Sequence, residues 1–142
     1  MTGLSPRVLP ISVPTPFPVG PMNAYLVDGE PLTLINAGPK TEAAWDALLA
    51  GLAGYGRRVE EVAQIVLTHA HMDHYGLLGR VVAACGAVVV AHPRSKLWLD
   101  DTAGEWAARG RYFSEFWTRA GVPAERRLRM TQSLSATAEY AE

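Results

Sequence analysis

The sequence has little of several features that mark whole classes of protein. It contains one cysteine in 142 residues, which excludes an internal disulfide and a cysteine-rich zinc site. This residue, Cys85, lies among small apolar residues, so a structural thiol is favoured over a nucleophile. No apolar run approaches the roughly 18 residues that cross a bilayer, and the N-terminus lacks the charged start and apolar stretch of a signal peptide. A cytoplasmic protein is expected.

An excess of charge of either sign is also absent. The chain has 13 Lys and Arg against 14 Asp and Glu, for a net charge of −1. A nucleic-acid-binding protein would need clustered cations on a basic domain, and the short basic run "RRLR" at 126–129 is better explained as a solvated face. With 49% apolar residues and the length of one domain, the chain can bury a core. We find no clear nucleic-acid or membrane signature.

The first part of the chain predicts strands joined by turns. Residues 8–13 favour a strand, and a stiff proline-rich connector follows it. Residues 23–28 and 32–36 favour two further strands on either side of a turn signal at 28–31. This arrangement predicts a β-hairpin.

An amphipathic helix is predicted next. Thr41 is a suitable N-cap, and Gly54 and Gly56 are expected to end the helix. Apolar residues recur at helical spacing and form one stripe, which consists of Trp45, Leu48, Leu49 and Leu52. Packing against the core is the favoured explanation of this stripe.

Two further strands complete the pattern. Residues 64–68 and 87–92 are short runs rich in branched residues and predict buried strands, with a helix over 75–85 between them. Strands that alternate with helices predict a layered α/β fold in which part of the sheet is parallel.

The chain changes character after residue 93. Residues 94–120 predict helices that are interrupted at Gly104, Gly110 and 121–123. Their large aromatic side chains favour core or lid packing over a ligand pocket, and they are Trp98, Trp106, Phe113, Phe116 and Trp117. Residues 133–142 carry no strong pattern, so a frayed end is expected there.

The segment "HAHMDH" at 69–74 holds three of the four histidines. Side chains two apart at the end of a strand point to the same side, so His69 and His71 can face one metal ion. Asp73 and His74 come where the chain bends into the next helix, and they face a neighbouring point. Neutral imidazole and carboxylate suit Zn²⁺, with Fe and Mn also accessible. A purely structural role is disfavoured, because every ring nitrogen in so crowded a group needs a partner.

The stretch "LTHAHMDHYG" resembles the H-x-H-x-D-H signature of the metallo-β-lactamase fold hydrolases. Upstream, "NAYLVDGEPLTLINAGP" resembles the opening hairpin of that family, and "GAVVVAHP" resembles its next strand. The resemblance covers residues 8–93 and implies an αββα sandwich, of which this chain carries the N-terminal half as a mixed sheet with flanking helices. We expect one domain in which residues 1–93 carry the motif and residues 94–142 form a helical continuation with a poorly ordered end.

The resemblance also implies roles for individual residues. His69 and His71 would bind a first metal ion, and Asp73 and His74 a second. In the family a metal-activated hydroxide attacks a carbonyl or phosphoryl centre, and Asp73 would orient that hydroxide and handle a proton. Thr68 is a candidate for orienting a metal ligand, although its hydroxyl equally serves to finish the strand.

Two departures from the family pattern stand out. Asn36 occupies a position where the family usually has an aspartate beneath the metal loop. A neutral amide orients a ligand less strongly, and Asn36 is equally well explained as a turn-former beside Gly38. The family's remaining ligands come from later in the chain, where only His92 is found, and His92 is better explained as a cap of its strand. No strand is predicted after residue 93.

Three explanations for the missing half remain open. Half a sandwich exposes an apolar sheet face, and two histidines fall short of the three protein ligands of a catalytic zinc. The favoured explanation is a fragment of a longer hydrolase. The alternatives are a homodimer that covers the exposed sheet face, and a non-catalytic remnant that binds metal weakly.

The substrate class is only loosely indicated. The opening segment resembles the glyoxalase II-like and β-lactamase-like-protein-2-like branches of the family, which act on thioesters and on nucleic acid respectively. Because no basic, aromatic-interleaved patch is present, we favour hydrolysis of a thioester, lactone or other ester-like small acyl substrate. A phosphodiesterase or ribonuclease activity is the alternative.

Overall fold

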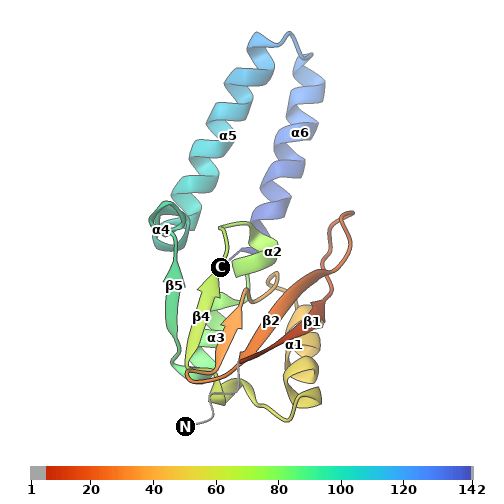
Figure 1. The fold of residues 1–142 in the computed structure, drawn as a ribbon. Coiled ribbons are helices and arrows are strands. Elements are labelled where there is room, and N and C mark those ends of the chain that lie inside the picture. The colour runs from red at the N-terminus through yellow and green to blue at the C-terminus, as the bar shows by residue number, and fades with distance from the viewer. Residues whose placement is uncertain (1–5, 142) are drawn as a thin grey trace.

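The computed structural model describes residues 6–141, in which five strands form one mixed sheet (Figure 1). The strands are β1 (Arg7–Val13), β2 (Met22–Asp28), β3 (Thr33–Ile35), β4 (Gln64–Leu67) and β5 (Val88–Ala91). The helices are α1 (Glu42–Gly54), α2 (Met72–Tyr75), α3 (Leu78–Cys85), α4 (Pro93–Asp100), α5 (Thr102–Arg119) and α6 (Ala124–Thr137), with 3₁₀ turns η1 (Val59–Glu61) and η2 (Ala138–Tyr140).

The strands follow one another across the sheet in chain order. β1, β2 and β3 pair antiparallel, whereas β3, β4 and β5 pair parallel. The pairing of β2 with β3 confirms the predicted hairpin. The mixed sheet with flanking helices confirms the predicted fold class for the N-terminal half of the sandwich.

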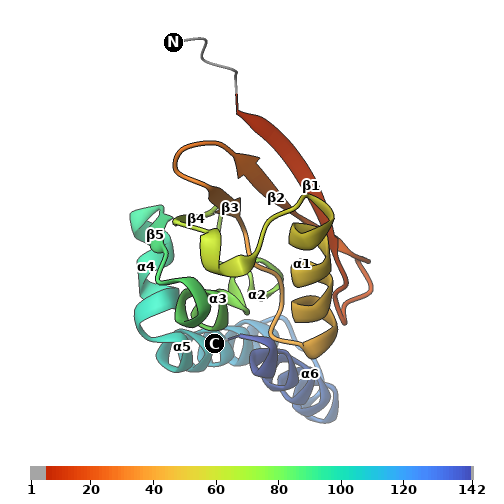
Figure 2. The same ribbon diagram turned by 90° about the horizontal axis from the view of Figure 1, so that it is seen from below.

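One face of the sheet carries the hydrophobic core. Helices α1 and α3 lie on this face (Figure 2). Leu26, Leu34 and Ile65 are neighbours across three strands, and all three have no exposed surface. Cys85, at the end of α3, packs against this core and donates its thiol to the Val81 carbonyl at 3.0 Å, in keeping with a structural thiol.

Helix α1 forms as the sequence predicts. The Thr41 hydroxyl accepts a hydrogen bond from the Ala44 amide at 3.1 Å and so caps the first turn. Leu48 and Leu52 are fully buried, and the rest of the apolar stripe is half-buried at the margin of the core.

The opposite face of the sheet is not covered by any helix of residues 6–141 (Figures 1 and 2). The strand register places Pro10, Tyr25, Ile35, Val66 and Val90 in one row across all five strands. The three central members are half-buried, and Val90 is 42% exposed. This row is therefore an apolar surface that lacks a second layer.

Strand β5 differs from the prediction of a buried strand. It lies at the edge of the sheet, where Val88 is 65% exposed and Val90 faces the uncovered side. An apolar run occurs both in central strands and in edge strands whose outer face is uncovered, so the sequence alone does not separate the two. Within the described residues no strand follows β5, as the sequence predicts.

The helices also differ from prediction in three places. The helix predicted over 75–85 is divided into α2 and α3 at Gly76, where the backbone fits closely against Lys40 and Tyr140. Gly104 and Gly110 do not interrupt α5, because one glycine costs a long helix only about 1 kcal/mol. The segment 133–140, for which the sequence shows no strong pattern, is helical as the end of α6 and η2.

Helices α5 and α6 form an antiparallel hairpin that projects away from the sheet (Figure 1). Neither helix has a fully buried side chain. Aromatic rings stack along α5, with ring centroids 5.4 Å apart for Phe113 and Trp117 and 6.3 Å apart for Tyr112 and Phe116. No helix of the described residues is long and apolar enough to span a bilayer.

Candidate metal centre

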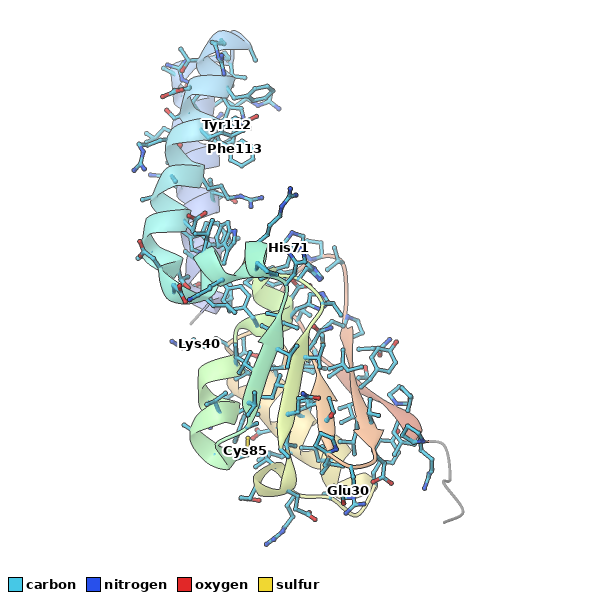
Figure 3. All side chains as sticks on the ribbon, turned by 60° about the vertical axis from the view of Figure 1, so that its left-hand side comes forward. Glu30, Lys40, His71, Cys85, Tyr112 and Phe113 are labelled. Carbon is cyan, nitrogen blue, oxygen red and sulfur yellow. The ribbon has the colours of Figure 1, made fainter. Side chains whose placement is uncertain are left out.

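The histidine-containing loop lies at the edge of the sheet where the parallel strands end. The carboxyl ends of parallel strands meet at one edge, and loops there are held by a rigid scaffold. Asn36 follows β3, and Thr68 and His69 follow β4. Figure 3 shows His71 at the junction between this edge and the helical hairpin. The loop is therefore in contact with both parts of the molecule.

The three imidazoles of the loop are gathered into one cluster. His69 Nε2 lies 3.1 Å from His71 Nδ1, and the ring centroids of His69 and His74 are 4.2 Å apart. Asp73 Oδ2 lies 3.4 Å from His74 Nε2. The structure thus brings together all four residues that the motif singled out, with His69 at the centre. Their division between two ions stays a prediction.

The donor atoms fit a metal ion in part. Two nitrogens bound to one tetrahedral zinc at about 2.0–2.1 Å stand about 3.3 Å apart, close to the 3.1 Å between His69 and His71. His74 Nδ1 is buried and lacks a hydrogen-bond partner among the described residues, so its lone pair or proton is available to a ligand or ion. Within residues 6–141 no group of three or more His, Cys, Asp or Glu side chains is arranged so that it could hold a metal ion. The pair therefore suits one ion that takes at least one further ligand.

Asn36 and Thr68 determine how His69 presents its ring. The backbone amide and the hydroxyl of Thr68 both donate to Asn36 Oδ1, each at 3.1 Å. Because that hydroxyl has one proton, its oxygen accepts from His69 Nδ1, 2.9 Å away. The protonated Nδ1 leaves His69 Nε2 with a free lone pair that faces His71. This is the tautomer in which His69 can bind a metal ion through Nε2.

Asn36 also shapes the backbone beneath the loop. It is 4% exposed and has a φ of +61°, a left-handed conformation that asparagine tolerates better than most residues. The two interpretations of Asn36, as a turn-former and as a residue that acts on a ligand, are therefore compatible. Its amide oxygen acts on His69 through the Thr68 hydroxyl, from which it accepts a hydrogen bond.

The surroundings favour neutral imidazoles. Burial lowers the pKa of His69, and neighbouring His71 lowers it further against the opposing effect of Asp73. Burial is likewise the largest cause that lowers the pKa of His74, and it outweighs the opposing effect of Asp73. Since metal ions bind the neutral ring, these shifts keep both residues ready to ligate near neutral pH.

An apolar cavity of about 290 Å³ opens beside the loop. Its walls come from the histidine-containing loop, from α4 and α5, and from the connector before β2. The lining residues include Phe17, His71, Asp73, Tyr75, Trp98 and Trp106. Tyr75 is buried beneath the cavity, where burial raises its pKa. Its contacts with Thr102 and Trp106 offset part of that effect but do not reach full hydrogen-bond geometry at the Tyr75 hydroxyl.

A second, more polar cavity of about 230 Å³ shares part of its lining with the first. It is lined by His69 and by two arginines, Arg94 of α4 and Arg109 of α5. His71, Trp98 and Arg109 line both cavities. His71 thus contributes both to an apolar cavity and to a second cavity that contains two guanidinium groups.

The sequence did not reveal several residues of this site. Arg94 and Arg109 lie far along the chain from the motif and carry no pattern that distinguishes them from surface arginines. Trp98 and Trp106, for which core or lid packing was the favoured interpretation, line the apolar cavity with ring centroids 5.6 Å apart. His92 lies outside the cluster; it caps α4, and its Nδ1 accepts from the Arg94 amide at 3.1 Å.

The combination of this sheet and this loop agrees with comparisons against known proteins. The chain matches the family model of the metallo-beta-lactamase superfamily over residues 17–131, and it belongs to that superfamily.

Individual relatives match only part of their own length. The chain is 37% identical over 135 residues to the Bacillus subtilis (strain 168) protein "Probable metallo-hydrolase YqjP", covering 92% of this chain and 42% of that protein. A metallo-beta-lactamase family protein from Thermus thermophilus superposes with a TM-score of 0.73 at 28% identity, covering 94% of this chain and 42% of the other. A subclass B3 metallo-beta-lactamase of Bradyrhizobium japonicum shares the fold, with a TM-score of 0.54 at 22% identity over 68% of this chain and 34% of the other. The chain therefore spans less than half the length of these relatives.

Proposed function

We propose that this chain carries the metal-binding loop and part of the substrate pocket of a metal-dependent hydrolase. The observation that carries the proposal is the gathering of three imidazoles and Asp73 at the carboxyl edge of the parallel strands, beside an apolar cavity. His69 and His71 would hold one ion, and Asp73 and His74 a second. Zinc suits these donors, with iron or manganese as alternatives. Such an ion supplies a hydroxide near neutral pH and polarises the oxygen of the substrate.

The residues of the chain supply orientation and proton handling. The Asp73 carboxylate lines the apolar cavity and lies 3.4 Å from His74, so it can accept a proton from an attacking water and hold that water in place. Asn36 and Thr68 orient His69 through their hydrogen bonds. The aromatic side chains of the cavity exclude bulk water from the reacting group.

The size and lining of the cavity favour a small acyl substrate. A volume of about 290 Å³ with aromatic walls suits a compact apolar group rather than a polymer. We therefore propose a thioester, lactone or other ester-like substrate, as in the glyoxalase II-like branch that the opening segment resembles. A phosphodiesterase or ribonuclease activity is the second candidate, and the arginines of the second cavity are what favours it.

Metal content and turnover test this proposal together. The purified 142-residue chain is expected to bind about one to two equivalents of zinc, iron or manganese by elemental analysis, and the loaded chain is assayed on a panel of thioesters, lactones and phosphodiesters. His71→Ala is expected to lose metal, whereas His92→Ala, outside the cluster, is expected to retain it. Absence of turnover on the whole panel, with His71→Ala indistinguishable from the parent, would reject a hydrolase activity of this chain.

A metal-poor remnant without catalysis is the competing possibility. It predicts a folded chain that binds less than one equivalent of metal, with equal metal content in the parent and in His71→Ala. Location in the cytoplasm stays a prediction from the sequence.

We further propose that two copies of the isolated chain associate through the uncovered sheet face. The row formed by Pro10, Tyr25, Ile35, Val66 and Val90 is apolar and continuous across the sheet, and sheets pack face to face through such surfaces. Sedimentation is expected to show a dimer that Val66→Glu converts to a monomer. A parent chain that sediments as a monomer at all concentrations would reject this association.

A further inference from the structure

Arg109 has an unusual position for an exposed arginine. It is the one residue of α5 that lines both cavities of the site together with His71 and Trp98. Its guanidinium carbon lies 5.9 Å from the ring centroids of Trp98 and Trp106 and 5.6 Å from that of Phe113. These aromatic faces hold the cation in place at the mouth of the site by cation–π attraction.

Arg109 has no ion-pair partner among the described residues. Asp73 lines the apolar cavity together with Arg109, and Glu105, one turn earlier in α5, lines a neighbouring cavity with it, but neither carboxylate forms an ion pair with Arg109. Arg94 adds a second cation to the polar cavity, and no acidic side chain lines that cavity among the described residues. An arginine fork of this kind is suited to an anionic oxygen group, which it can bind through two parallel hydrogen bonds.

The two cavities are therefore complementary in chemistry. The first is lined mainly by aromatic side chains and the second by Arg94 and Arg109, with His71, Trp98 and Arg109 common to both. We infer that the ligand of this site is a small amphiphile whose apolar group fills the aromatic cavity and whose carboxylate or phosphate group is held by Arg109, assisted by Arg94. This inference rests on the proposed function for the identity of the site and narrows its substrate to anionic molecules. Arg109 is then a positioning residue that selects the substrate by its charge.

Binding of matched probes to the metal-free chain tests this inference. In the presence of EDTA, tryptophan fluorescence from the cavity wall is followed while 4-phenylbutyrate, its neutral amide 4-phenylbutyramide, or phenyl phosphate is added. The two phenylbutyryl probes have the same shape and differ in charge. We expect the carboxylate to bind at least about tenfold more tightly than the amide, as a charge-assisted hydrogen bond provides. Whichever of 4-phenylbutyrate and phenyl phosphate binds more tightly shows whether the site prefers a carboxylate or a phosphate group.

Variants separate the charge of Arg109 from its packing. Arg109→Gln is expected to abolish the preference for the carboxylate over the amide, and Arg109→Lys is expected to retain part of it. Arg111→Gln, two residues along the same helix and outside both cavities, is the matched control and keeps the full preference. Thermal melting of each variant verifies the fold.

The outcomes are decisive in both directions. Equal affinity for the carboxylate and the amide, no binding of either, or equal effects of Arg109→Gln and Arg111→Gln would overturn the inference. Because the probes are measured without metal, a chain that shows the charge preference but hydrolyses nothing when loaded would reject the hydrolase and leave the anion site standing. A chain that hydrolyses neutral esters but shows no preference for the carboxylate probe would support the hydrolase and reject the anion site.

Discussion

The sheet and the helical hairpin α5–α6 are stabilised in different ways. In the sheet, Leu26, Leu34 and Ile65 are removed completely from solvent, whereas neither helix of the hairpin contains a fully buried side chain. Yet the site draws on both parts, with His71 from the sheet edge and Arg109 from the hairpin. The sheet therefore holds most of the folding free energy, while the hairpin contributes chemistry to a site that the sheet alone would leave open.

The largest expected contrast is in core substitutions. Leu34→Ala removes a completely buried side chain from the middle of the sheet and is expected to lower the free energy of unfolding by about 2–5 kcal/mol. Leu128→Ala in α6, where the side chain is 59% exposed, is expected to change it by no more than about 0.5 kcal/mol. Urea unfolding followed by circular dichroism measures both. Equal losses would show that the hairpin carries as much of the fold as the sheet.

Two glycines sharpen the comparison. A methyl group at Gly76 would meet the backbone of Lys40 and Tyr140, which cannot move aside as a side chain can, so Gly76→Ala is expected to cost about 1–3 kcal/mol. A methyl group at Gly110 in α5 meets nothing, and Gly110→Ala is expected to stabilise the chain by about 0.5–1 kcal/mol. Thermal unfolding should move in opposite directions for the two variants. A stabilising Gly76→Ala would contradict the close approach at that position.

The hydrogen bonds beneath His69 provide a test within the sheet edge. Thr68→Val removes the hydroxyl that links Asn36 to His69, and it is expected to weaken metal binding by about 10–100-fold through loss of the preferred tautomer. Thr68→Ser keeps the hydroxyl and is the matched control. Metal affinity is measured by competition with a chelating dye. If both variants bind metal as the parent does, Thr68 serves only to finish its strand.

The smallest expected contrast concerns surface ion pairs. Arg57 donates to Asp28 Oδ1 from two nitrogens, at 2.6 and 3.1 Å, and this pair joins the connector after α1 to the end of β2. The pair between Arg129 and Glu125 lies within one exposed helix. Arg57→Gln is expected to lower the urea midpoint slightly, and Arg129→Gln to leave it unchanged, because exposed ion pairs within a helix contribute little. A larger shift for Arg129→Gln would assign the hairpin a stabilising role that its packing does not suggest.

The elements of the sheet could be predicted because local signals and burial agree there. Thr41 caps helix α1, the apolar stripe of α1 packs against the core, and the turn at 28–31 joins two paired strands. The incorrect predictions concern elements whose burial depends on the surrounding structure and not on the local sequence. Val88 and Val90 have the composition of a buried strand, but the strand lies at an uncovered edge.

The site divides in the same way. The motif residues His69, His71, Asp73 and His74 are adjacent in sequence, so their spacing alone shows that they can meet. Arg109 lines the same cavities as His71 only because of the path that α4 and α5 take after β5, and no local pattern encodes that path. The hydrogen bonds of Asn36 likewise depend on the parallel pairing of β3 with β4, which brings residues 36 and 68 together.

The hairpin leaves the body after β5 and returns to it beside the loop, where the Lys40 amide donates to the Tyr140 carbonyl at 3.1 Å and the Phe17 and Tyr140 rings meet at 5.3 Å. Trp106 and Arg109 lie in the first half of α5, and the cavity is closed at the far end of α6 by Thr137. All the hairpin residues that line the cavity are thus at the base of the hairpin, and the residues at its tip do not line the cavity. Whole helical turns can therefore be inserted or deleted at the tip without changing the residues that line the cavity. The length of the hairpin is thus independent of the chemistry of the site.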